Sequence, residues 1–290
     1  MGKTATKSKR TAPRLGILPP VLLALAVAVL VGKALRESGR VPEDVPQRNA
    51  VWVSDGVNLI EIVPDENLSV NERPAEDFTA DGDLIRYRGG ARQGVDVSAH
   101  QEEIDWTQAA ESGISFAIVR LGYRGATEGT LYTDRFFEEN YRGAREAGLD
   151  VGVYFFSQAL TEQEAIQEAD YVREVLAGRE LQLPVMFDWE IVEKEGSRSV
   201  GREAEVVTDC AAAFCRRIAQ SGYRAGVYFN RQQGYHSYDL PALRDYTFWV
   251  ADPNDHPDFY YDFAIWQYTF RGSVPGIGAP VDRDMLFEQN

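Results

Sequence analysis

Cysteine and histidine are scarce in this 290-residue sequence. The two cysteines, Cys210 and Cys215, lie five residues apart, and the three histidines are scattered at positions 100, 236 and 256. Five residues correspond to about 140° around a helix axis, so we expect both cysteines to be buried residues of one helix. The pattern contains neither a disulfide framework nor the spacing of metal ligands, and we expect no metal and no cofactor.

Positive charge is scarce beyond the first 36 residues. Those residues hold seven basic side chains and no acidic one, so the remaining chain carries 23 basic and 45 acidic residues, a net charge of −22. Phosphate binding depends on clustered Lys and Arg, so this balance argues against a nucleic-acid partner. The composition is otherwise ordinary for a globular protein, and the length allows one large domain or two small ones.

Long apolar runs are missing except at residues 15–32, which carry no charge. They follow a basic tail, residues 1–14, and Lys33 comes directly after them. Eighteen residues are just enough to span a bilayer, and the preceding positive charges predict a cytoplasmic N-terminus. We therefore expect a single-pass membrane anchor with the body in the periplasm or outside the cell. A cleaved signal peptide and a secreted protein are the alternative, because the apolar centre is short and residues 32–34 are suited to cleavage.

The rest of the chain divides near residue 90. Residues 33–90 are rich in Pro, Glu, Asp and Arg, and two short β-like runs at 51–53 and 58–63 indicate a stalk with a possible short β-hairpin. From 91 to 290, strand-like and helix-like segments alternate. Candidate strands cover residues 94–98, 115–122, 151–157, 183–190, 224–230, 247–252, 263–269 and 281–287. Candidate helices cover 105–112, 134–147, 162–177, 203–220 and 241–245, with Thr161 and Gly178 as caps.

Eight strands can close a barrel, and the helices become short or absent late in the chain. This pattern predicts an α/β fold, an irregular (β/α) barrel with eight strands and an incomplete ring of helices. A doubly wound open sheet is the alternative. We expect the protein to be a monomer.

Two carboxylates end the apolar segment at 183–187. Side chains alternate along a strand, so Asp188 and Glu190 should share one face while Phe187 and Trp189 point the other way. Like charges in a partly desolvated site raise one pKa, which makes an acid/base pair available near neutral pH. Such a pair suits the cleavage of a glycosidic bond. An isolated pair of this kind also occurs as a salt bridge or a helix cap.

Two further acids favour the catalytic interpretation. Asp96 lies in the first candidate strand and Asp282 in the last, and active sites of β/α barrels lie at the C-terminal ends of the strands. We therefore expect four carboxylates from three strands to converge: Asp96, Asp188, Glu190 and Asp282.

Aromatic residues occur near the same strand ends. Sugar rings stack their apolar faces on aromatic side chains, and their hydroxyl groups need polar partners. The candidate aromatic residues are Tyr123, Tyr154, Phe156, Tyr228, Trp249, Trp266 and Tyr268, and the candidate polar residues are Arg120, Asn230 and Gln267. Core packing explains any single aromatic equally well, and we assign that role to Phe155, Phe229 and Phe248.

Several segments in the same order resemble glycoside hydrolase family 25. They are residues 94–98 (GVDVS), 100–101 (HQ), 105–106 (DW), 187–190 (FDWE), 249–251 (WVA), 265–268 (IWQY) and 281–282 (VD). The family comprises lysozymes with an irregular β/α barrel that cleave the bond between N-acetylmuramic acid and N-acetylglucosamine in peptidoglycan. The resemblance covers residues 94–288 and leaves the N-terminal third unmatched.

The resemblance implies that Glu190 is the general acid. Asp188 would stabilise the oxocarbenium-like centre or orient the acetamido group of the substrate, and Asp96 and Asp282 would complete an acidic floor. Glu102 stands where a glycine is common and Phe155 where a histidine is common, so we expect the shape of the sugar subsites to differ. Two other functions fit the sequence: a non-catalytic peptidoglycan-binding module, and a hydrolase of another N-acetylated polysaccharide.

Overall fold

The computed structural model describes residues 49–288. The basic tail and the segment expected to be an anchor or signal, residues 15–32, lie outside these described residues. Within 49–288, no helix is both long enough and apolar enough to cross a bilayer.

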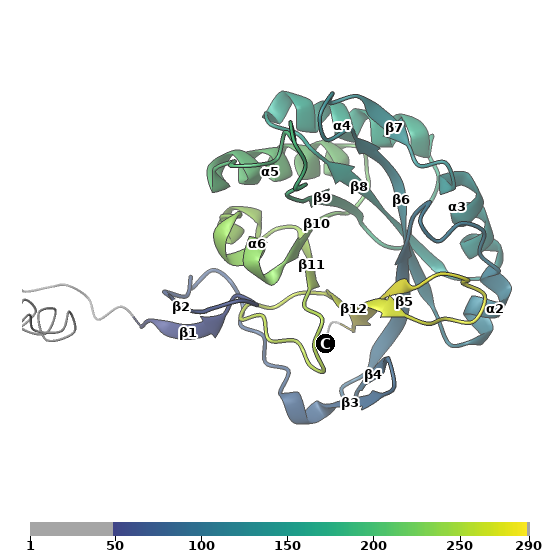
Figure 1. Ribbon diagram of the computed structural model, residues 1–290, viewed down its shortest axis with the longest axis horizontal. Coiled ribbons are helices and arrows are strands. Elements are labelled where there is room, and N and C mark those ends of the chain that lie inside the picture. The colour runs from purple at the N-terminus through teal and green to yellow at the C-terminus, as the bar shows by residue number, and fades with distance from the viewer. Residues whose placement is uncertain (1–48, 289–290) are drawn as a thin grey trace, which may run out of the picture. The chain divides into compact units, whose positions relative to one another are not determined.

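Eight strands close into a barrel (Figure 1). In order around the barrel they are β5 (Ala91–Val97), β6 (Phe116–Arg124), β8 (Asp150–Ser157), β9 (Val185–Trp189), β10 (Ala225–Asn230), β11 (Thr247–Ala251), β12 (Ile265–Gly272) and β13 (Val281–Phe287). The sheet closes because β5 pairs with both β6 and β13. The irregular barrel is confirmed, each strand overlaps a candidate strand of the sequence, and the open sheet is excluded.

The last strand runs against its neighbours. The other seven strands are parallel, whereas β13 is antiparallel to both β12 and β5. Asp282 therefore lies at the start of its strand, and the assumption that all the acids occupy C-terminal strand ends was wrong for this residue. An antiparallel strand begins at the rim where the parallel strands end, so Asp282 is still the register partner of Asp96.

Alternation along the strands separates two apolar layers. The inner layer consists of Phe116, Ile118, Tyr154, Leu183, Met186, Tyr228, Trp249, Ala251 and Ile265. The outer layer lies between the sheet and its covering segments and contains Phe187 and Trp189, as expected. Phe155, Phe229 and Phe248 also belong to the outer layer, which confirms their assignment to the core.

Helices cover only part of the barrel. They are α2 (Trp106–Glu111), α3 (Phe137–Glu146), α4 (Glu162–Leu176), α5 (Ala204–Gln220), α6 (Arg231–His236) and the 3-10 helix η2 (Leu240–Leu243). The Thr161 hydroxyl accepts a hydrogen bond from the Glu164 N–H, which confirms the expected cap of α4. Cys210 and Cys215 are free and buried on α5, as expected. The sequence pattern missed α6, which begins with a capping box between Asn230 and Gln233.

Residues that precede the barrel cover its helix-poor side. They form η1 (Ala75–Asp77) and a hairpin of β3 (Phe78–Asp81) and β4 (Leu84–Tyr87). The Phe78 ring meets Trp266 edge to face, with 5.4 Å between centroids, and Tyr87 meets Phe287 at 5.4 Å. The outward faces of β12 and β13 are thus shielded by this segment, where a regular barrel would place helices.

Two further pairings complete the described fold. The apolar runs near residue 55 pair as a hairpin of β1 (Val51–Ser54) and β2 (Leu59–Ile62). A short strand, β7 (Leu131–Thr133), pairs with the end of β6.

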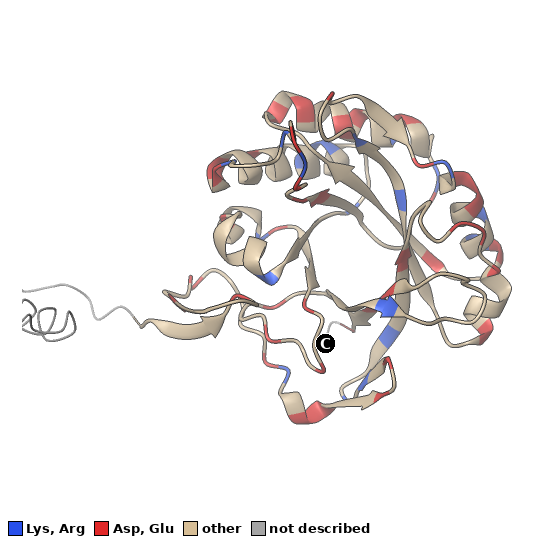
Figure 2. Cartoon of the chain, viewed as in Figure 1, with Lys and Arg blue, Asp and Glu red and all other residues tan. Residues whose placement is uncertain are grey.

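The outer surface is acidic. Figure 2 shows Asp and Glu positions along α3, α4 and α5, and each of these helices has at least one glutamate in its first turn. Acidic residues therefore contribute negative charge to the outer surface of the barrel, and this charge attracts or repels charged ligands that approach it.

Candidate active site

Asp188 and Glu190 lie together at the end of β9. Asp188 points into the barrel and is 4% exposed, and Glu190 follows one residue beyond the strand and is partly exposed. The two carboxyl groups are close enough for each to shift the pKa of the other. The shared face predicted from strand alternation is therefore present, with Asp188 deeper and Glu190 nearer to solvent.

Burial controls the protonation of this pair. Burial, the negative charge of Glu190 and the polar contact with its carboxyl group raise the pKa of Asp188 well above its usual range, and the nearby Arg120 opposes the shift. Burial also raises the pKa of Glu190, whereas the polar contact with Asp188 opposes this shift. The pair therefore retains a proton at a pH where isolated carboxyl groups would both be ionised, and that proton belongs to the pair.

Asp96 and Asp282 face each other across the β5–β13 ladder. Burial and the charge of Glu190 raise the pKa of Asp282 to about 6. Burial and the charges of Asp284 and Asp282 raise the pKa of Asp96 well above its usual range. These electrostatic couplings connect the two acids of β5 and β13 to the pair on β9, so the four predicted carboxylates converge in one cluster.

A fifth acid, Asp284, lies beneath this cluster and was missed in the sequence. It is fully buried, and its Oδ1 accepts a hydrogen bond of 2.8 Å from the Trp249 indole N–H. Burial raises its pKa well above the usual range. Asp284 is two residues after Asp282, the same spacing as Asp188 and Glu190, so strand alternation alone could have identified it.

A hydrogen-bonded chain orients Asp96. The Tyr228 hydroxyl donates to Gln267 Oε1 at 2.9 Å, and Gln267 Nε2 donates to Asp96 Oδ2 at 2.6 Å. Trp249 packs edge to face on both Tyr228 and Tyr154, with centroid distances of 4.6 and 6.0 Å. Four of the predicted substrate-binding residues thus lie in the barrel interior with the acids: Tyr154, Tyr228, Trp249 and Gln267.

Arg120 is held beside the acids by Asp134. Its Nε donates to Asp134 Oδ2 at 2.7 Å, and the same carboxylate accepts the backbone N–H groups of Ala99 and Phe136. The charge of Arg120 opposes the rise in the pKa of Asp188, so it acts on the Asp188–Glu190 pair. Its guanidinium also lies 5.6 Å from the ring centroid of Tyr123.

Other predicted residues lie differently. Trp266 and Tyr268 belong to the outer layer, where the Trp266 indole donates to the Asp252 carbonyl and the Tyr268 hydroxyl to Gln93. The Asn230 side chain caps α6. The structure therefore does not bring these three to the carboxylates. Phe156 and Tyr123 are partly exposed and pair in register at the ends of β8 and β6.

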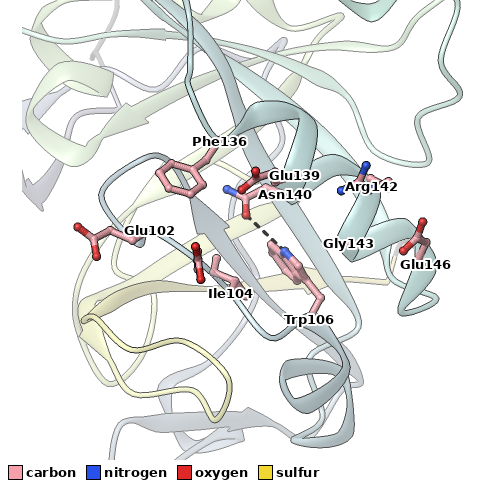
Figure 3. Close-up of a pocket in the computed structure, with 10 residues that line it drawn as sticks. Glu102, Ile104, Trp106, Phe136, Glu139, Asn140, Arg142, Gly143 and Glu146 are labelled. Atoms are coloured by element: carbon pink, nitrogen blue, oxygen red, sulfur yellow. Dashed lines mark hydrogen bonds between the residues drawn. The ribbon is translucent and has the colours of Figure 1, made fainter.

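The two departures from the family pattern have structural explanations. Phe155 is fully buried in the outer layer, 6.2 Å from the ring of Tyr171, so it does not alter the cleft as we had expected. Glu102 has φ 55°, in the left-handed region that favours glycine. It lines a cavity of about 300 Å³ between the loop after β5 and α3, in which Trp106 donates to Asn140 (Figure 3). None of the five clustered acids lines this cavity.

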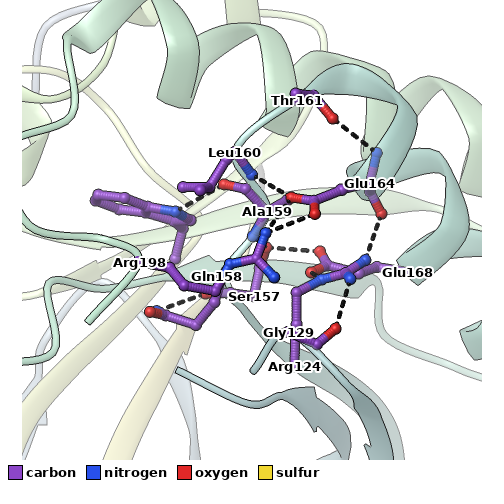
Figure 4. Close-up of polar contacts among 11 residues, drawn as sticks. Arg124, Gly129, Ser157, Gln158, Ala159, Leu160, Thr161, Glu164, Glu168 and Arg198 are labelled. Atoms are coloured by element: carbon purple, nitrogen blue, oxygen red, sulfur yellow. Dashed lines mark hydrogen bonds and ion pairs between the residues drawn. The ribbon is translucent and has the colours of Figure 1, made fainter. Parts of the chain in front are cut away.

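A buried ion pair joins β6 to α4, and Figure 4 shows it with the polar groups around it. Arg124 Nε lies 2.6 Å from Glu168 Oε1, and the Ser157 hydroxyl donates to Glu168 Oε2 at 2.6 Å. Burial raises the pKa of Glu168 to about 7, against the opposing charge of Arg124. A second pair, Arg198 with Glu164 at 2.5 Å, ties the loop after β9 to α4. These contacts connect α4 to the ends of β6 and β8 and to the loop after β9.

No metal site accompanies these acids. Within residues 49–288, no group of three or more His, Cys, Asp or Glu side chains is arranged to hold a metal ion.

Known proteins are similar to this chain in sequence and in fold. Residues 95–277 match the sequence profile of glycosyl hydrolases family 25. The autolytic lysozyme of Clostridium acetobutylicum is 25% identical over 198 residues, which cover 68% of this chain and 56% of that protein. Lysozyme M1 of Streptomyces globisporus is 30% identical over 205 residues, which cover 66% of each chain.

Solved structures agree with the observed barrel. The bacterial lysozyme from Streptomyces coelicolor has a TM-score of 0.56 at 26% identity, over 68% of this chain and 92% of that chain. The modular autolysin LytC from Streptococcus pneumoniae has a TM-score of 0.61 at 22% identity, which shows the fold alone. This chain spans 56% of the length of LytC and of the clostridial lysozyme. Because the profile match takes in most of the barrel, including Asp96, Asp188 and Glu190, this chain belongs to glycosyl hydrolases family 25.

Proposed function

We propose that this protein is a muramidase, a peptidoglycan hydrolase that cleaves the β-1,4 bond between N-acetylmuramic acid and N-acetylglucosamine. The observation that carries the proposal is the Asp188–Glu190 pair at the barrel rim, where Asp188 is buried, Glu190 is partly exposed, and burial raises the pKa of both carboxyl groups. Two relatives are named lysozymes, and LytC has a structure in complex with a synthetic peptidoglycan ligand.

Glu190 is the general acid in this proposal. It is the more exposed member of the pair, so it can reach the glycosidic oxygen of a bound glycan. Burial raises its pKa, which keeps a proton available for transfer as the bond between the anomeric carbon and that oxygen breaks. The leaving sugar departs as an alcohol, and the negative charge remains on Glu190 until a proton is recovered from water.

Asp188 assists from below. As a carboxylate it would stabilise the oxocarbenium-like centre, act as nucleophile or base, or hold the acetamido N–H while the acetamido oxygen attacks the anomeric carbon. Product stereochemistry separates these roles: retention in the first-formed product, read by NMR, fits a nucleophilic or substrate-assisted route. Inversion would eliminate both and leave Asp188 as the base or as a stabiliser of the oxocarbenium-like centre.

The remaining interior residues shape the cleft. Asp96 and Asp282 complete the acidic floor, and their raised pKa values limit the negative charge gathered beneath the sugar. Tyr154, Tyr228 and Trp249 offer ring surface for sugar stacking beside the acids. We expect Arg120, Tyr123 and Phe156 to contact the glycan at the β6 and β8 side of the rim.

Lysis of purified cell walls tests the proposal. We expect the full chain to clear a wall suspension, and Glu190→Gln to lower the rate at least about 100-fold because it removes the transferable proton. Glu193→Gln is the matched control, since Glu193 is exposed three residues further along the same loop. Absence of clearing by the parent would overturn the enzymatic function.

Two results would point to the other candidate functions. Retention on walls without release of fragments would indicate a non-catalytic peptidoglycan-binding module. Release of reducing ends from a chitin-like chain, with none from peptidoglycan, would indicate a hydrolase of another N-acetylated polysaccharide.

We also propose that residues 15–32 anchor a monomeric enzyme in the membrane, with the barrel in the periplasm or outside the cell. Eighteen uncharged residues after a basic tail support this proposal. Recovery of the full-length chain in the membrane fraction is expected. A shortened chain in the medium would show cleavage of a signal peptide instead.

A further inference from the structure

Glu190 lies just beyond the reach of the sheet. The last ladder pair between β8 and β9 joins Ser157 to Trp189, and the last pair between β10 and β9 joins Tyr228 to Asp188. The carbonyl groups of Trp189 and Glu190 are therefore at the point where strand pairing ends. A backbone without such pairing is free to leave the strand direction, and Glu190 would then leave the face it shares with Asp188.

Two glutamine side chains bind these two carbonyl groups. Gln158 Nε2 donates to the Glu190 carbonyl at 2.8 Å, and Gln233 Nε2 donates to the Trp189 carbonyl at 2.8 Å. Gln158 directly follows β8, and Gln233 lies in α6 directly after β10. The two side-chain amides thus come from the strands on either side of β9, and they extend its hydrogen bonding where the ladders end.

Both glutamines are themselves fixed. Gln158 is fully buried and also donates to the Ser157 carbonyl at 2.9 Å. Gln233 is 5% exposed, and its Oε1 accepts from the Asn230 N–H in the capping box of α6. Immobile donors of this kind hold their acceptor in place without losing side-chain entropy when substrate binds.

We propose that Gln158 and Gln233 are positioning residues that keep the Glu190 carboxyl on the face of Asp188. The proposal rests on the role of Glu190 as general acid given above. Glu190 comes directly after the last residue of β9, so it shares the face of Asp188 only while it continues the strand. Gln233 binds the backbone carbonyl directly before the Glu190 Cα, and Gln158 binds the carbonyl directly after it. Neither glutamine needs to contact the substrate.

The test replaces each amide with a side chain of similar shape that cannot donate. We expect Gln158→Met and Gln233→Met to lower kcat about 10- to 100-fold, the range that a displacement near 1 Å costs, with KM changed less than about threefold. As Glu190 moves away from Asp188 and toward solvent, its pKa should fall toward the ordinary value, and the basic limb of the pH–rate profile should move to lower pH.

Gln182→Met is the matched control. Gln182 accepts hydrogen bonds from Arg145 and the Val151 N–H before β9 begins, at the opposite end of the barrel. This variant should lower the melting temperature without moving the pH–rate profile. A Gln158→Glu variant adds a rescue arm, because its carboxyl can donate to the Glu190 carbonyl only while protonated, so its kcat relative to the parent should recover as the pH falls.

The pKa of Glu190, followed by carbon NMR of the carboxyl group in the parent and the variants, separates the possible failures. Unchanged kcat, pH limb and Glu190 pKa in folded Gln158→Met and Gln233→Met would overturn the positioning role. A parent that releases no wall fragments would overturn the proposed function, and the NMR titration would still decide whether the two amides position Glu190.

Discussion

Asp282→Asn should raise the free energy of unfolding above pH 6, although it removes one carboxylate from the acid cluster. Asn is nearly isosteric with Asp and carries no charge. In the parent, burial and the charge of Glu190 raise the pKa of Asp282 to about 6 from 3.8. The folded state therefore holds this proton over a pH range in which the unfolded chain has already lost it, and ionising Asp282 in the folded state costs free energy.

The magnitude follows from the shift. A pKa raised from 3.8 to about 6 corresponds to roughly 3 kcal/mol of free energy, because a change of one in the pKa is worth about 1.36 kcal/mol. This figure is an upper value, since Asp282 is partly exposed and its charge interacts with that of Glu190. The unfolded state binds fewer protons between pH 4 and 6, so the free energy of unfolding of the parent falls as the pH rises through that range. The Asn variant lacks this contribution.

Urea unfolding at several pH values measures the effect. The difference in unfolding free energy, variant minus parent, should be small below pH 4, rise between pH 4 and 6, and stay constant above pH 6. Asp255→Asn is the control, because Asp255 is exposed and forms no hydrogen bond or ion pair among the described residues; its difference should be flat. A flat or negative difference for Asp282→Asn above pH 6 would refute the reasoning.

Three other perturbations have defined outcomes. Glu168→Ala should lower the free energy of unfolding by about 3–5 kcal/mol, because it leaves Arg124 buried without its partner. The control Glu162→Ala breaks an exposed ion pair of the same helix and should cost less than about 1 kcal/mol. Equal losses for the two variants in urea unfolding would contradict this reasoning. Glu102→Gly should raise the melting temperature through a gain of up to about 1 kcal/mol, because φ 55° strains a side chain; a lower melting temperature would show that the glutamate contributes contacts that outweigh the strain. Lytic activity should rise with moderate salt, because a body of net charge −22 is repelled by the carboxylates of peptidoglycan, and a monotonic fall in wall clearing would argue against that repulsion.

Alternation along strands made much of the site predictable. Each side chain on β9 points to the face that the sequence indicates, so Asp188 could be placed inside the barrel and Trp189 outside it. The same rule places Asp284 on the face of Asp282. The prediction covered only the acids expected at the rim, and Asp284 lies deeper in the barrel.

Other features depend on contacts that are distant in sequence. Trp266 looked like a sugar-binding residue, but it lies on the outer face of β12, where Phe78 covers it. The antiparallel direction of β13 could not be predicted either, because the apolar pattern of a strand does not indicate whether it runs parallel or antiparallel to its neighbours. Gln158 and Gln233 carry no motif, and their role becomes visible only when the end of β9 is seen between its two neighbours.

The most direct test of the account is the chemical identity of the ends released from purified peptidoglycan. Reducing-end analysis of walls digested by the parent should yield new N-acetylmuramic acid ends, and Glu190→Gln should yield almost none under the same conditions while Glu193→Gln matches the parent. New N-acetylglucosamine ends, or equal release by Glu190→Gln, would contradict the proposal that this barrel is a muramidase with Glu190 as its general acid.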